Sequence, residues 1–553
     1  MFLDLRKLPD DHRIDCDLCI IGGGPAGIAI AREYIGTDLK VCLVESAEEY
    51  DDPSQNLYAG APQPSRKRAR SIRDGVHYGA LALHSRLRHF GGSSNHWGGY
   101  CAPLAPEDLA KRDWIPDSGW PIDWRELRHY YPRAQRLCEL GPYLYDDTLW
   151  RGTDANAYAF DTAKLVNRFY QFSPPTRFGD RYGDALKAAA NVTVLFHANA
   201  TQIALAANAA SADALTVKSL SGKYGRIQAR HFVLACGGIE NARLLLASNS
   251  VATAGIGNTR DIVGRYFMDH LYDSVGSLLV SERPARFLSQ YGEITPANAG
   301  HPLVKSRYAP DPVMFQAAIS PSAAVQQRNR TGGVALFIRG DWSRTDEGVS
   351  AVYEAIESDT AGAPENQAGS LLNILRNLNT ALPEIKSVVQ GKKAEHLPVL
   401  FAIAEQAPNR LSRITLGSEK DALGSPRARI DWRLSEQDRR TFAQMPELLA
   451  GEFGRLGIGR VHKAVWLDDE APYLYRGDFS RILEPGRHHS GTTRMAHDPA
   501  RGVVDADCQV FGVSNLSVAG SSVFPTIGSA NPTLTIVALA LRLADHLKTR
   551  LRG

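Results

Sequence analysis

The first 45 residues contain a pattern that few folds can accommodate: an apolar strand, a glycine-rich turn, a helix and a second strand that ends in an acid. Residues 17–21 are DLCII, and GGGPAG follows at once, with Gly22, Gly24 and Gly27 in G-x-G-x-x-G spacing. The sequence IAIAREYI then has a helical pattern, and KVCLVE predicts a second strand that ends at Glu45. This order is typical of the βαβ unit of a dinucleotide-binding Rossmann domain.

Each residue type in this pattern has a physical task. Gly22 makes the tight turn, Gly24 lets the backbone approach a pyrophosphate, and Gly27 lets helix and strand pack closely. The helix N-terminus offers free N–H groups to the phosphates. Glu45 can accept two hydrogen bonds from a ribose diol, and the absence of a basic neighbour argues against a 2′-phosphate. The motif alone leaves NAD and FAD open.

Two further segments extend the nucleotide-binding unit. Residues 192–206 predict a strand, a turn and another strand, and residues 229–248 predict a strand, a Cys-Gly-Gly turn and a helix. Gly237 and Gly238 again permit close backbone approach. An ordinary strand-to-helix turn without a ligand explains this second segment equally well.

The segment 488–533 holds the densest set of polar side chains among small residues. His488 and His489 are adjacent, and SGTTR and GSSVF around them supply hydroxyl groups and little bulk, as a cofactor or substrate surface requires. Asn531 stands where N-cap residues stand, and Pro532 suits the first turn of the helix that follows. The apolar run LTIVALALRLA contains Arg542 and predicts a buried helix instead of a membrane span.

The composition restricts the class of protein. The chain has 553 residues, 44% hydrophobic residues and a net charge of +3, which predicts a globular protein of at least two structural units and no nucleic-acid partner. The seven cysteines favour a reducing compartment. Cys16 and Cys19 form a C-x-x-C inside a predicted strand, so we expect no metal site there. The N-terminus has no Sec-type pattern, which predicts a cytoplasmic protein.

Four motifs together resemble the glucose–methanol–choline (GMC) oxidoreductase family: GGGPAG, FGGSSNHWGG, HHSGTTRM and GSSVFPTIGSANPTLT. The His-Trp pair of the second motif is similar to the sugar-oxidising branch, which includes pyranose oxidases and the large subunits of fructose and gluconate dehydrogenases. The resemblance implies bound FAD, with His488 as catalytic base and Asn531 as its partner. His489 stands where those relatives carry an apolar residue.

The resemblance also assigns the loop GGSSNHWGG to the flavin. It implies that His96 contacts the dimethylbenzene edge, where some relatives form a covalent link between this histidine and the flavin, and that Trp97 excludes water. The residues expected to contact FAD are Gly22, Gly24, Gly27, Glu45, Gly91, Gly92, Ser94, Asn95, His96, Trp97, Ala200, Ala235, Gly237, Gly520, Ser521, Asn531, Pro532 and Thr533.

The implied reaction is oxidation of an alcohol, a secondary hydroxyl of a sugar or glycoside, by His-assisted hydride transfer to flavin N5. Dioxygen, a quinone or a redox partner subunit would reoxidise the flavin, and a partner subunit that carries a signal would also permit export. Two alternatives stay open: oxidation of a non-sugar natural product, and a non-catalytic binding protein on a flavoprotein fold. An NAD(P)H-linked flavin enzyme would need a second complete G-x-G-x-x-G unit, and the sequence has none.

We expect an α/β FAD-binding domain of the Rossmann type from residues 1–100, 190–272 and 484–553. An α+β substrate domain from residues 101–189 and 273–483 would complete the chain, with a largely antiparallel sheet of five or six strands. Its strands are expected in the β-like runs at 313–320, 332–340, 397–406, 412–417 and 426–434. Residues 435–453 predict an amphipathic helix with Phe442, Met445, Leu449 and Phe453 on its buried face. Residues 340–396 predict a mobile loop.

Overall fold

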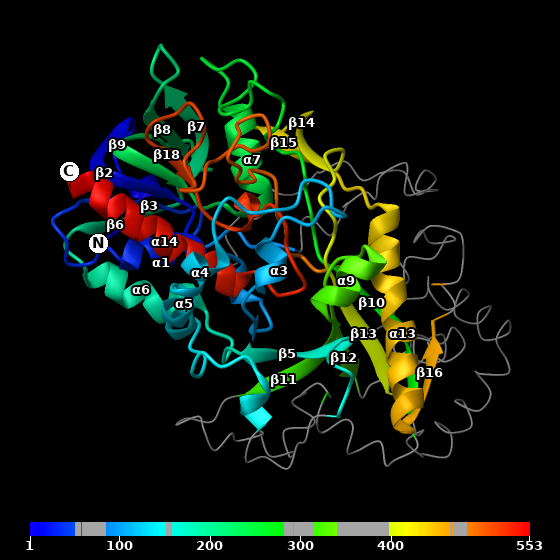
Figure 1. Ribbon diagram of the computed structural model, residues 1–553. Coiled ribbons are helices and arrows are strands. Elements are labelled where there is room, and N and C mark those ends of the chain that lie inside the picture. Colours follow the sequence, from blue (N-terminus) through cyan, green and yellow to red (C-terminus); the bar gives the residue numbers. More distant parts are fainter. Residues whose placement is uncertain are drawn as a thin grey trace, which may run out of the picture.

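The computed structural model describes residues 1–49, 57, 85–150, 158–280, 291, 314–339, 398–464, 467 and 484–552. Two large sheets lie side by side in this part of the chain, and helices cover both of them (Figure 1). This arrangement confirms the predicted fold class. The predicted loop at 340–396 lies outside the described residues.

The first sheet is built around the N-terminal glycine motif. Strand β2 (His12–Ile21) lies at its centre, in parallel register with β3 (Val41–Val44) on one side and β9 (Tyr224–Leu234) on the other. The remaining strands continue outward from β3 and β9: β1 (Phe2–Asp4), β6 (Val192–Phe196), β7 (Asn199–Leu205), β8 (Ala212–Lys218) and β18 (Leu516–Val518). Segments from both ends and the middle of the sequence therefore meet in one sheet, as the motifs predict.

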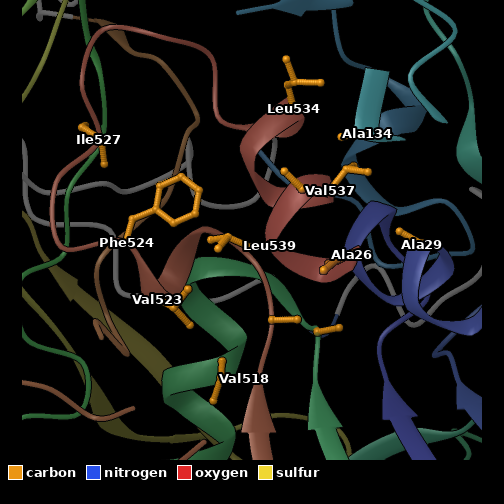
Figure 2. Close-up of a cluster of buried hydrophobic side chains, with 14 of the residues drawn as sticks. Ala26, Ala29, Ala134, Val518, Val523, Phe524, Ile527, Leu534, Val537 and Leu539 are labelled. Atoms are coloured by element: carbon orange, nitrogen blue, oxygen red, sulfur yellow. The ribbon is translucent and has the colours of Figure 1, made fainter. Parts of the chain in front are cut away.

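Helix α1 (Pro25–Arg32) follows β2 directly and packs against the C-terminal helix α14 (Thr533–Arg552). Figure 2 shows Ala26 and Ala29 of α1 on one side of α14, with Val523, Phe524 and Ile527 on the other. The run LTIVALALRLA is thus a buried helix, as predicted, and Arg542 within it forms ion pairs with Glu126 and Asp507. None of the described helices has the length and apolar character needed to cross a membrane.

The second sheet is antiparallel throughout its described part. Its strands are β4 (Tyr100–Cys101), β5 (Leu165–Phe172), β10 (Leu271–Val280), β11 (Phe315–Pro321), β12 (Val334–Arg339), β13 (Val399–Ala404), β16 (Gly459–Lys463) and β17 (Glu484–Pro485). Helix α13 (Glu436–Leu456) packs on β10, β12 and β13, and all four of its predicted core residues are fully buried. The predicted amphipathic helix is therefore confirmed.

The prediction of a single five- or six-stranded sheet is wrong in two respects. The runs at 412–417 and 426–434 form a separate hairpin, β14 (Arg413–Lys420) and β15 (Pro426–Asp431), which packs on α7 (Gly237–Ala247) of the first sheet's layer. In addition, β4, β5, β10, β16 and β17 join the sheet from segments where no strand was predicted. Which sheet a strand joins depends on distant partners that its own residue pattern does not reveal.

The remaining α-helices of the described residues are short. They are α3 (Pro106–Leu109), α4 (Trp124–Arg128), α5 (Tyr131–Leu137), α6 (Phe178–Ala188) and α9 (Ala323–Asn329). Among them, α6 packs on α1 and β6. Two single 3₁₀ turns, Gly92–Asn95 and Ser521–Val523, belong to motifs singled out in the sequence.

Candidate active site

A cavity of about 540 Å³ lies where the carboxyl ends of β2, β3 and β9 meet residues of the second sheet. A site at this edge of a parallel sheet is the usual position for a nucleotide ligand. Of the residues expected to contact FAD, the following line it: Gly22, Gly24, Glu45, Gly92, Ser94, His96, Trp97, Ala200, Ala235, Gly237, Gly520, Ser521, Asn531, Pro532 and Thr533. His488 and His489 line it as well.

The structure does not place the other three expected FAD contacts, Gly27, Gly91 and Asn95, in the cavity wall. A Cβ at Gly27 would lie 1.9 Å from the Gly22 carbonyl oxygen, so Gly27 permits close packing of α1 on β2, as predicted. Gly91 has a φ of +93° and starts the loop turn. Asn95 was expected at the cofactor, but its amide donates to the Phe90 carbonyl at 2.8 Å and so closes the loop itself.

Four glycine turns form a cradle around the cavity. Gly22, Gly237 and Gly520 have φ values of +109°, +83° and +109°, a region that side chains other than glycine rarely adopt. A Cβ at Gly237 or Gly520 would meet no other atom within 4 Å, because the cavity begins there. At the fourth turn, a Cβ at Gly92 would lie 3.0 Å from the Gly24 Cα. The backbone thus borders the cavity directly on several sides.

Glu45 is held at the end of β3 by backbone donors. Its carboxylate accepts hydrogen bonds from the Gly23 N–H at 2.7 Å and the Ser46 N–H at 2.6 Å. Burial raises the pKa of Glu45, and these two backbone hydrogen bonds oppose that shift. The carboxylate therefore has a fixed orientation at the cavity wall, where it can accept hydroxyl donors.

Two arginines of this wall were missed in the sequence. Arg86 and Arg88 form ion pairs with Glu240 on α7 at 2.8 and 3.4 Å, and Arg243 pairs with the same carboxylate. Burial alone would raise the pKa of Glu240, but the three arginines hold it well below its usual range. The R-x-R spacing directly before the GGSSNHW loop was the available signal, since alternate residues of an extended segment face the same side.

His488 and Asn531 meet inside the cavity. The His488 Nε2 lies 3.4 Å from the Asn531 Nδ2, which also reaches the Tyr272 hydroxyl at 3.4 Å. The Asn531 Oδ1 is buried and has no hydrogen-bond partner among the described residues. The predicted N-cap role of Asn531 is wrong: α14 begins at Thr533, and the Pro532 carbonyl accepts the first helical hydrogen bond, from Ile536. The Asn531 amide therefore faces the site.

Asp269 and His270 hold His488 in place, and neither was predicted as a site residue. The buried Asp269 carboxylate accepts the His488 backbone N–H at 2.7 Å, and the His270 Nδ1 lies 2.8 Å from the His488 Nδ1. Burial lowers the pKa of His488 well below its usual value, and the neighbouring His270 and His489 lower it further. The His488 imidazole is therefore neutral at pH 7 and able to accept a proton.

His489 has different surroundings from its neighbour. Its Nε2 lies 3.2 Å from the Ser85 hydroxyl, and its ring stacks on Phe267 with centroids 5.9 Å apart. Burial, followed by the charge of Arg86, lowers the pKa of His489 to about 3. The geometry thus pairs His488, and not His489, with Asn531.

The loop 91–99 presents His96 to the cavity. The Trp97 indole donates to the Thr176 carbonyl at 3.0 Å and packs edge-on against Phe178, while Arg177 donates to the Ser94 carbonyl at 2.6 Å. These contacts fix the loop from outside. Burial, together with the charges of Arg487 and Arg177, lowers the pKa of His96, so its ring is neutral at pH 7.

Comparison with known proteins agrees with this geometry. A family model described as GMC oxidoreductase matches residues 408–540. The chain is 22% identical to 2-methyl-1,2-propanediol dehydrogenase of Mycolicibacterium austroafricanum, an alignment that covers 97% of this chain and 95% of the relative. Its C-terminal part thus matches the GMC oxidoreductase family, and the whole chain is similar to a dehydrogenase that acts on a diol. The chain is therefore an oxidoreductase that acts on alcohol groups.

Two other GMC relatives have names that refer to sugars or aminoglycosides. Paromamine 6′-oxidase of Streptomyces fradiae is 25% identical, with 97% of this chain and 91% of that protein covered. The fructose dehydrogenase large subunit of Gluconobacter japonicus is 26% identical over 59% of this chain and 48% of its own length. The solved structure of pyridoxine 4-oxidase from Mesorbium loti covers 97% of this chain and 99% of its own, with a TM-score of 0.51 at 18% identity, and shows the shared fold.

Proposed function

We propose that this GMC oxidoreductase oxidises a secondary hydroxyl of a sugar or glycoside to a carbonyl. The observation that carries the proposal is the pairing of His488 with Asn531 inside a cavity bordered by glycine turns. The relatives that act on fructose and on paromamine support a sugar-like substrate, because one of them aligns over nearly the whole chain. The diol dehydrogenase is the reason to include non-sugar alcohols in the test.

The residues of the cavity fit FAD. The N-terminus of α1, where no side chain caps the Gly24 position, would hold the pyrophosphate, and Glu45 would accept the hydroxyl groups of the ribose. Gly237 and Gly520 leave room for the cofactor against the backbone. In this assignment, the FAD-binding domain consists of residues 1–100, 190–272 and 484–553. The substrate-binding domain consists of residues 101–189 and 273–483.

Within the proposed reaction, each catalytic side chain has one task. The bound flavin supplies the hydride acceptor at its N5 atom. His488 takes the hydroxyl proton of the substrate at Nε2, because a neutral imidazole within hydrogen-bond reach is an effective base. Asn531 donates its Nδ2 N–H to the same substrate oxygen and thereby orients the carbon that loses hydride.

The function is tested by anaerobic reduction of the purified protein. We expect its yellow colour to bleach with at least one member of a panel of free sugars, glycosides, sugar acids and 1,2-diols, and heat-released flavin to elute as FAD in chromatography. Bleaching by sugars or glycosides supports the proposal, whereas bleaching by diols alone contradicts the substrate class. A protein that holds FMN or no flavin would contradict the cofactor assignment. Peroxide formed on admitting air would identify dioxygen as the electron acceptor, and its absence would favour a quinone or a redox partner.

His96 is predicted to retain the flavin. We expect the His96→Ala variant to lose flavin on dialysis, because the ring faces the cavity from a loop that Trp97 and Arg177 fix. Acid precipitation of the wild-type protein distinguishes the two forms of retention: colour in the pellet indicates a covalent link to His96, and colour in the supernatant indicates a contact. Full flavin content in the dialysed variant would remove His96 from the cofactor site.

A further inference from the structure

We propose that His270 is a positioning residue that fixes the tautomer of His488, so that the Nε2 of His488 is free to accept the substrate proton. The proposal rests on the proposed function of His488, which it extends to the atoms of the ring. Each ring nitrogen of His270 has a hydrogen-bond partner, and the two partners together determine where the protons reside.

The argument begins at the far nitrogen of His270. Its Nε2 lies 2.9 Å from the Gly528 carbonyl oxygen. A carbonyl can only accept, so the Nε2 of His270 carries a hydrogen. Burial lowers the pKa of His270 to about 4, although the Gly528 hydrogen bond and the Glu405 charge oppose the shift, and the ring is neutral at pH 7. In a neutral imidazole with a hydrogen on Nε2, the Nδ1 has a lone pair and no hydrogen.

The next hydrogen bond then has only one direction. The Nδ1 atoms of His270 and His488 are 2.8 Å apart, which requires a hydrogen between them. Because the His270 nitrogen can only accept, the His488 Nδ1 must donate. The neutral His488 ring then has no hydrogen on Nε2, and this nitrogen lies 3.4 Å from the Asn531 Nδ2, a donor. One assignment of protons therefore satisfies the whole chain of contacts from the Gly528 carbonyl through His270 and His488 to Asn531.

His270 and the Gly528 peptide, where this chain of contacts begins, are closely packed. His270 is fully buried, and its ring stands at 87° to that of His488 with centroids 5.0 Å apart. Gly528 has a φ of +55°, and a Cβ there would lie 2.6 Å from the Asp108 carboxyl carbon, so its peptide is closely packed. When His488 accepts the substrate proton at Nε2, its Nδ1–H still donates to the neutral His270. The same hydrogen bond therefore also stabilises the imidazolium that forms.

Rapid anaerobic reduction by the panel sugar that reduces the wild-type enzyme fastest tests the proposal. His270→Phe preserves the packed ring and removes the acceptor, so we expect the limiting rate to fall by about 10- to 100-fold, the loss known for partners that orient metal-binding histidines, while the apparent sugar affinity changes by less than about twofold. His270→Asn places an oxygen near the lost Nδ1 and should recover part of that rate. His231→Phe is the matched control, because His231 is a buried histidine that contacts Ser517 on the first sheet. A wild-type rate in His270→Phe would overturn the proposal.

A direct measurement of the tautomer in the wild-type protein does not depend on the His270 variants or on the identity of the base. In the holoenzyme labelled with ¹⁵N-histidine, the signal that disappears in His488→Gln should show a protonated Nδ1 and an unprotonated Nε2. A hydrogen on Nε2 would overturn the proposal. If His488→Ala reduces at the wild-type rate while the Nδ1–H tautomer is observed, the proposed base is wrong and the action of His270 on the ring stands.

Discussion

Replacing His488 with alanine should slow anaerobic reduction of the flavin by about 10²- to 10⁴-fold, the usual contribution of a single acid–base group. The bound flavin should keep its visible spectrum, because the glycine cradle, Glu45 and the loop 91–99 are untouched by this change. Stopped-flow absorbance with the most reactive sugar measures the limiting rate, and a thermal unfolding curve checks that the variant is folded.

His489→Ala is the matched comparison, because the two histidines are adjacent, with His489 buried and His488 partly buried. Its ring faces Ser85 and Phe267, so we expect a limiting rate within about tenfold of the wild type. The opposite pattern, with a slow His489→Ala variant and a normal His488→Ala variant, would assign the proton transfer to His489 and contradict the role proposed for His488. Equal small effects in both would mean that neither histidine takes the substrate proton.

The parts of the fold that were predicted from the sequence are those in which neighbours along the chain determine the structure. Gly22, Gly24 and Gly27 predict strand, turn and helix within about 30 residues, because the tight turn and the close packing of helix on strand are local requirements. The buried face of α13 followed from its own periodicity. The hairpin of β14 and β15 was assigned to the wrong sheet, since its packing on α7 is a contact between distant segments.

The same distinction applies to the site. His488 and Asn531 were identified because they belong to motifs whose small neighbours suggest a ligand surface. His270 was not predicted, because the role that we propose for it depends on a contact with a residue 218 positions away in the sequence. Asn95 was misplaced for the opposite reason: it lies inside a cofactor motif, but its amide is used to close the loop at Phe90. A motif identifies a segment near a ligand, whereas the direction of each side chain depends on its hydrogen-bond partners.

Gly27→Ala should cost the protein both its flavin and much of its stability. The new Cβ would lie 1.9 Å from the Gly22 carbonyl oxygen and 3.1 Å from the Gly22 carbonyl carbon, which are backbone atoms and cannot rotate away. Helix α1 would have to move away from β2, and the turn that precedes it would move too. Overpacking of this kind typically destabilises a protein by 1–3 kcal/mol, and we expect about the upper end of that range here. Because Gly22 and Gly24 line the cavity, the cradle would lose its shape as well.

Gly451→Ala makes the same substitution inside helix α13, where a Cβ would meet nothing within 4 Å. Alanine is favoured over glycine in a helix interior by about 1 kcal/mol, so this control should unfold at the same or a higher temperature and keep its full flavin content. The measurements are the thermal unfolding midpoint and the ratio of flavin to protein absorbance after dialysis. If Gly27→Ala matched this control in both, the contact between α1 and β2 would be looser than the structure shows, and the glycine turn could not be what shapes the site for FAD.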